Sequence, residues 1–109
     1  MTEVRIVDES GAMKGSKEER YDLVPVEPLR ALAVHYSKGA QKYEPNNWKK
    51  GFMWSLSYAA LMRHLQLWWE GETYDQETGT HHMIAVAWHA FALMWFETNG
   101  KGTDDRPKS

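Results

Sequence analysis

The sequence contains no cysteine, so a disulfide framework, a thiolate zinc site and a cysteine nucleophile are all excluded. A long hydrophobic run is also missing. The most apolar stretch, residues 83–96, has 14 residues and is interrupted by His89, whereas a bilayer-crossing helix needs roughly 18 to 20. The first ten residues lack the apolar core of a signal peptide, so we expect a cytoplasmic protein that does not engage a membrane.

A strong excess of charge of either sign is absent too. Lys and Arg number 13 against 15 Asp and Glu, which gives a net charge of −2. Polymeric nucleic acids and anionic membranes attract strongly basic surfaces, so neither is an expected partner. Any phosphate that binds must be met by a few local cations.

Several motifs of known catalytic classes do not occur. The sequence has no GxxxxGK[ST] or GxGxxG loop, no GxSxG elbow, no HExxH, no Glu-x-x-His pair and no His-Asp dipeptide. Their absence disfavours P-loop, Rossmann, serine hydrolase, zincin, di-iron and HD phosphohydrolase assignments.

Hydrophobic periodicity predicts an all-α protein. With 109 residues, 42% of them hydrophobic and 26% charged, the chain forms one globular domain. Apolar spacing indicates helices at about 25–43, 55–70 and 80–98, and no alternating pattern is long enough to favour a sheet. We expect Ser55 or Ser57 to cap the second helix and Thr80 to cap the third.

The two ends are expected to lie outside this helical domain, which spans residues 20–98. Residues 1–19 form a predicted flexible lead with at most one short strand. Residues 99–109 combine two glycines, charges and a proline, so they form a predicted disordered tail.

The third predicted helix is apolar almost all round. Its aromatic side chains, Trp88, Phe91, Trp95 and Phe96, point in too many directions for one neighbouring helix to cover them. We therefore expect a homo-oligomer that assembles through this helix.

An acidic connection precedes the third helix and is a candidate metal site. Glu72, Asp75 and Glu77 lie within six residues, and His81 and His82 follow. Carboxylate oxygens are the ligands that Mg²⁺ or Mn²⁺ prefer, and an imidazole can join them. The alternative is a solvated acidic loop that complements the dipole of the following helix.

Cations and aromatic side chains are interleaved in the middle of the chain. Phosphates bind Arg or Lys, and a nucleobase can stack on an aromatic ring, although exposed lysines are common without either role. The set comprises Arg20, Lys42, Lys49, Lys50 and Arg63 with Tyr43, Trp48 and Trp54.

Three strings, taken together over residues 17–97, resemble the phage dATP/dGTP diphosphohydrolase family, relatives of the MazG-like all-α nucleoside triphosphate pyrophosphohydrolases. The strings are Arg20 to Pro25, Gly39 to Gly51 with Lys42, Tyr43, Asn47 and Trp48, and Arg63 to His82 with Glu72, Asp75 and Gly79. The resemblance implies a three-to-four-helix, oligomeric bundle that uses a divalent cation, Mg²⁺ or Mn²⁺, to cut a purine deoxynucleoside triphosphate into monophosphate and pyrophosphate. It would act in the host cytoplasm if a phage encodes it.

The resemblance also implies a role for each matching residue. Glu72, Asp75 and His82 would hold the metal ion, and Glu77 and His64 would be catalytic. Lys42, Arg63 and Arg20 would bind phosphate, and Tyr43, Asn47, Trp48 and Trp54 would face the base.

The sequence departs from the wider superfamily, which places Glu-x-x-Glu on one helix and Glu-x-x-Asp on another. Within the predicted helical domain, residues 20–98, only Glu72 to Asp75 fits either pattern. Two alternatives therefore remain. One is a catalytically weak or inactive module that binds and sequesters a nucleotide, including a signal nucleotide. The other is a helical assembly factor whose tryptophans are oligomer contacts and whose histidines are core.

Overall fold

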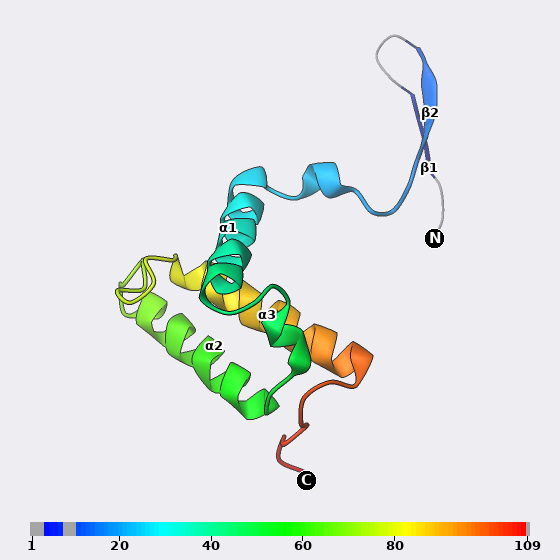
Figure 1. Ribbon diagram of the computed structural model, residues 1–109. Helices are drawn as coiled ribbons and strands as arrows, with labels where there is room; N and C mark the ends of the chain where they lie inside the picture. The colour runs from blue at the N-terminus through cyan, green and yellow to red at the C-terminus, as the bar shows by residue number, and fades with distance from the viewer. Residues whose placement is uncertain (1–3, 8–10, 109) are drawn as a thin grey trace.

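Three long helices carry the fold of the computed structural model, which describes residues 4–7 and 11–108 (Figure 1). They are α1 (Val26–Lys42), α2 (Trp54–Trp69) and α3 (His82–Asn99). Each helix begins and ends within two residues of its predicted bounds, so the predicted helices are confirmed. None of the helices in the described ranges is long and apolar enough to cross a membrane.

Helix α3 is the centre of the packing because it contacts both α2 and α1. It supplies Ile84, Ala85, Ala92 and Phe96 to the buried apolar core, and α1 adds Leu32. The alanines let the neighbouring helices approach α3 closely. The other buried positions are polar (Ser57, His64, Thr80 and His82), so part of the interior is polar.

An aromatic cluster covers the other end of α3. The short helix η2 (Asn47–Lys50) brings the Trp48 ring to 5.1–6.3 Å, between centroids, from four other rings. These belong to Tyr36, Trp88, Trp95 and Phe96. Edge-to-face packing of this kind is worth about 0.5–1.5 kcal/mol per pair beyond burial. Trp48 is therefore a packing residue in this fold.

The caps of two helices differ from the prediction. Helix α2 begins at Trp54 without a local side-chain cap, and Asp105 Oδ1 accepts a hydrogen bond of 2.9 Å from the backbone N–H of Ser55. Asp105 Oδ2 also accepts from the Ser55 hydroxyl. At α3, Nδ1 of His81 accepts from the Met83 N–H at 3.0 Å, so His81 and not Thr80 is the cap.

The chain after α3 makes specific contacts with the start of α2, which runs against the expected disordered tail over 99–109. The Trp54 ring donates its Nε1–H to the Lys101 carbonyl at 2.9 Å, and the Trp54 backbone N–H donates to the Thr103 carbonyl at 3.0 Å. The Arg106 guanidinium lies 4.8 Å from the centroid of the same ring. Polar contacts with little burial therefore hold residues 101–106 against α2. The composition of the segment does not reveal such contacts.

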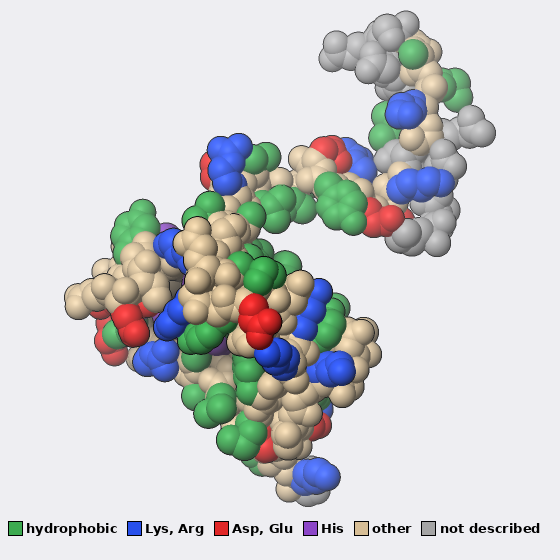
Figure 2. All heavy atoms as spheres, viewed as in Figure 1, with side chains coloured by type: hydrophobic (Ala, Val, Ile, Leu, Met, Phe, Trp, Pro, Cys, Tyr) green, Lys and Arg blue, Asp and Glu red, His purple; other side chains and the backbone are tan. Residues whose placement is uncertain are grey.

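The N-terminal segment contains two strands where at most one was expected. β1 (Val4–Val7) and β2 (Met13–Ser16) pair antiparallel, and the short helix η1 (Tyr21–Leu23) follows them. Four residues per strand are too few for alternation to be recognised in the sequence. Figures 1 and 2 show this segment standing clear of the three helices.

The expected homo-oligomer stays a prediction. Phe96 is fully buried within the chain, and Trp88 and Trp95 are half-buried, so three of the four aromatic side chains find intrachain cover. Phe91 and Met94 remain exposed on α3, at 56% and 72%. Their exposure still favours an interface on this helix.

Candidate functional site

The acidic connection between α2 and α3, residues 70–81, folds back on itself. The backbone N–H of Asp75 donates to the Thr80 carbonyl at 2.8 Å, and the Gly79 N–H donates to the Asp75 carbonyl at 2.7 Å. At its end, the His82 N–H donates to the Thr73 carbonyl at 3.0 Å. These bonds bring Asp75 to the junction of the two helices.

Three side chains meet at this junction: His64 from α2, Asp75 from the connection and His82 from the first turn of α3. One ligand atom from each lies within 4.8 Å of the other two, a spacing that could hold a metal ion. The two imidazole Nδ1 atoms are 2.9 Å apart. His82 is completely buried, and His64 is 9% exposed. We call these residues the His–Asp cluster.

Glu72 orients His82 from the opposite side of its ring. Its Oε1 lies 2.9 Å from His82 Nε2 and accepts that N–H. With its proton on Nε2, the His82 ring accepts at Nδ1 from His64 Nδ1. A carboxylate behind a histidine ligand fixes the tautomer and raises the basicity of the ligand nitrogen. We had expected Glu72 among the metal ligands, but the structure places it behind His82.

The surroundings favour the protonation states that bind a cation. Burial alone would raise the pKa of Asp75, but hydrogen bonds from the Thr78 hydroxyl (2.8 Å) and from backbone N–H groups outweigh it and lower that pKa. Burial lowers the pKa of His64, against an opposing effect of Asp75. At neutral pH Asp75 is therefore ionised and His64 is neutral.

Two further histidines extend this polar interior. His89 Nδ1 lies 2.7 Å from the hydroxyl of Ser57, and the His89 ring stacks on His64 with centroids 6.1 Å apart. Burial lowers the pKa of His89 to about 4. His35 on α1 lies 3.2 Å, through Nδ1, from the Thr80 hydroxyl, and burial followed by the charge of Lys38 lowers its pKa.

The remaining catalytic and phosphate candidates lie at different distances from the cluster. Glu77 follows Asp75 in the connection, where its N–H donates to Asp75 Oδ1 at 3.5 Å. Arg63 is exposed beside His64, and its charge helps to lower the pKa of that ring. Lys42 lies at the end of α1 over the Tyr43 ring, 5.3 Å from its centroid. Arg20 pairs with Asp22 at 2.8 Å in the N-terminal segment, so the structure does not bring it to the cluster.

The expected base-binding residues differ in their contacts. Tyr43 is 59% exposed at the end of α1, and Asn47 begins η2. Trp48 belongs to the aromatic cluster, and the Trp54 ring is in contact with Lys101 and Arg106 of the C-terminal segment. Packing therefore already engages both tryptophans.

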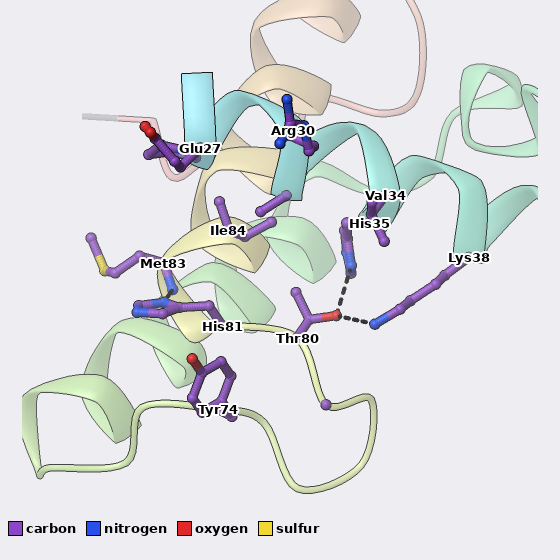
Figure 3. Close-up of a pocket in the computed structure, with 13 residues that line it drawn as sticks. Glu27, Arg30, Val34, His35, Lys38, Tyr74, Thr80, His81, Met83 and Ile84 are labelled. Carbon is purple, nitrogen blue, oxygen red and sulfur yellow. Dashed lines mark hydrogen bonds between the residues drawn. The ribbon is translucent and has the colours of Figure 1, made fainter. Parts of the chain in front are cut away.

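A cavity that the sequence did not predict lies between α1 and the start of α3 (Figure 3). Its volume is about 650 Å³. His35, Lys38 and Thr80 lie at one end, and Tyr74 and His81 form a wall. The positions of His35 and Lys38, three and six residues after the buried Leu32, would have been the only sequence signal for it.

The comparisons with known proteins give one match. A family model described as dATP/dGTP diphosphohydrolase, N-terminal, matches residues 8–106, which is nearly the whole chain. Neither the search of curated proteins nor the search of solved structures finds a match.

Proposed function

The chain belongs to the dATP/dGTP diphosphohydrolase family, and from this premise we propose that it hydrolyses a purine deoxynucleoside triphosphate to the monophosphate and pyrophosphate. The observation that carries the proposal is the His–Asp cluster, which joins two buried imidazoles and an ionised carboxylate at one helix junction. Such groups gathered at one point are typical of a site that binds a metal ion.

A divalent cation fits the donor atoms of the cluster. Two nitrogens that bind the same ion lie about 3 Å apart, close to the 2.9 Å between His64 Nδ1 and His82 Nδ1. Imidazole suits the later transition metals and carboxylate suits Mg²⁺ and Mn²⁺, so this mixed set favours Mn²⁺ over Mg²⁺. When bound, the ion would polarise phosphate oxygens and lower the pKa of a water molecule.

The other residues of the connection act on protons and charge. Glu72 holds the proton on Nε2 of His82, so Nδ1 of His82 accepts the Nδ1–H of His64, a hydrogen bond that a bound ion would replace. Glu77 is close enough for its charge to act on the pKa of His64, and we assign it as the base that accepts the proton of the attacking water. Arg63, exposed beside the cluster, would neutralise charge on the departing pyrophosphate.

Asp75→Asn tests the proposal. The substitution keeps the shape of the side chain but removes the negative charge that the cluster offers to a cation. We expect turnover of dGTP and dATP with Mn²⁺ to fall at least about 100-fold, measured as pyrophosphate released. The matched control is Asp104→Asn in the C-terminal segment, which should keep wild-type turnover.

Glu72→Gln separates positioning from catalysis. Loss of the carboxylate behind His82 should raise the Mn²⁺ concentration for half-maximal activity by roughly 10- to 100-fold, with turnover recovering at saturating Mn²⁺.

Full turnover of Asp75→Asn would place the active site elsewhere. If the wild type binds nucleotide but shows no turnover with any divalent cation, the nucleotide-sequestering function replaces the enzymatic one.

A further inference from the structure

The cavity between α1 and α3 has a mainly apolar floor. Ala31 and Val34 of α1 face Met83 and Ile84 at the start of α3. Its volume, about 650 Å³, falls within the range of about 300–1,000 Å³ that is usual for small-molecule sites. An apolar floor with a few polar groups at its rim suits a flat, partly polar ligand better than a small ion.

One wall of this cavity is aromatic. The rings of Tyr74 and His81 meet edge to face, with centroids 5.6 Å apart (Figure 3). Tyr74 remains 60% exposed although it lies in the connection next to the His–Asp cluster. Because His81 Nδ1 accepts the Met83 N–H, the proton of this ring lies on Nε2, where it can donate. An exposed aromatic ring beside a donor can hold a nucleobase.

The end of the cavity formed by His35, Lys38 and Thr80 carries a cation. Lys38 Nζ donates to the Thr80 hydroxyl at 3.3 Å (Figure 3), and it also donates to the Thr78 carbonyl at 3.4 Å. Across residues 4–7 and 11–108, no carboxylate lies within ion-pair distance of Lys38. Its charge is therefore available to an anion.

The same connection links Lys38 to the His–Asp cluster. Thr78, whose carbonyl accepts from Lys38, donates its hydroxyl to Asp75 Oδ2 at 2.8 Å. Thr80, whose hydroxyl accepts from Lys38, also accepts the Asp75 N–H at its carbonyl. Lys38 and Asp75 thus contact the same short stretch of chain, residues 78–80. A polyphosphate held by Lys38 would lie next to the cluster.

We propose that this cavity is the nucleotide-binding groove, with the purine base against Tyr74 and His81 and the phosphates held by Lys38 beside the His–Asp cluster. The inference rests on the proposed function and names the groove that serves that site. It replaces the sequence-based assignment of the base to Trp48 and Trp54 and of the phosphates to Lys42.

Two variants with matched controls test the groove. Lys38→Met should raise the KM for dGTP by roughly 10- to 100-fold, because a charge-assisted bond to phosphate is lost. Lys101→Met removes the same charge from the C-terminal segment and should leave KM unchanged. Tyr74→Leu should raise KM by roughly fivefold or more. The control Tyr58→Leu alters a tyrosine of matching exposure, 58% against 60%, on α2.

Inorganic tripolyphosphate, used as an inhibitor of dGTP hydrolysis, separates the two ends of the groove. Lys38→Met should raise the inhibition constant of tripolyphosphate by the same factor as it raises the KM for dGTP. Tyr74→Leu should leave the inhibition constant of tripolyphosphate unchanged. Unchanged KM for both variants would overturn the groove, and so would equal loss of tripolyphosphate inhibition in both.

Failure of the proposed function gives a different result from failure of the groove. If the wild type releases no pyrophosphate, thermal stabilisation by dGTP still reports binding. Stabilisation that persists in the wild type and is lost in Lys38→Met would support the groove without the enzyme. Stabilisation that is equal in wild type, Lys38→Met and Tyr74→Leu would place the nucleotide elsewhere.

Discussion

His89 should make the stability of this protein depend on pH, and His89→Asn should reduce that dependence. Burial lowers the pKa of His89 from 6.5 to about 4. In the unfolded chain the ring binds a proton below about pH 6.5, but in the folded chain it does so only near pH 4. Between these values the unfolded state holds more protons, so the free energy of unfolding falls as the pH falls.

The size of the effect follows from the shift. Each unit of pKa corresponds to about 1.36 kcal/mol, so His89 alone removes about 3 kcal/mol of stability between pH 6.5 and pH 4. Burial also lowers the pKa of His64 and of His35, which adds loss in the same direction. The difference between wild type and His89→Asn isolates the share of His89, because asparagine can still bond the Ser57 hydroxyl and does not titrate.

The measurement is urea unfolding followed by tryptophan fluorescence at several pH values from 7 to 4. The variant should lose stability at pH 7 but show a flatter dependence on pH, with the two curves converging by about 3 kcal/mol toward pH 4. Gly39→Ala, which alters stability without removing a titratable group, is the control and should keep the wild-type slope. Parallel curves for wild type and His89→Asn would refute the argument.

Two further substitutions test contacts that the sequence did not predict. Asp105→Ala removes the acceptor for the Ser55 N–H and should lower the free energy of unfolding measured by chemical denaturation, and no change would show that the contact does not cap α2. Gly102→Ala should cost more than about 1 kcal/mol, because its φ is +71° and a Cβ would lie 2.3 Å from the Phe52 carbonyl oxygen. Gly39→Ala, within α1 and with nothing within 4 Å, is the control and should stabilise by about 0.5–1 kcal/mol in the same assay.

The helices could be predicted because their signals are local. The apolar spacing of each helix lies within its own segment, and a glycine directly follows α3. The predicted bounds of the three helices are therefore within two residues of those observed. The cap of α2 could not be predicted in this way, since Asp105 lies fifty residues from Ser55 in the sequence. Packing between distant segments, and not propensity, decides that contact.

The candidate site divides along the same line. The sequence predicts a metal site at Asp75 and His82, and it predicts His64 as a catalytic residue, whereas the structure places His64 beside them as a third potential ligand. The place of Glu72 behind His82 depends on how the connection folds back, which no spacing rule encodes. Lys38 could not be predicted because it lies outside the strings that resemble the family, whereas Lys42, one helical turn further along α1, lies within them.

The His–Asp cluster is also local in the chain, and this has a consequence for how the protein assembles. His64 and His82 are only eighteen residues apart, and Glu72 and Asp75 lie between them, so closure of the α2–α3 hairpin is sufficient to gather the whole cluster. Loops of this length close at a low entropic cost, and contacts of short sequence separation form early. The His35–Thr80 contact at the edge of the groove instead spans 45 residues and needs α1 in place. During folding, the α2–α3 hairpin that carries the His–Asp cluster should therefore form before α1 packs against it to complete the groove, and a fragment lacking α1 would retain the cluster without the groove.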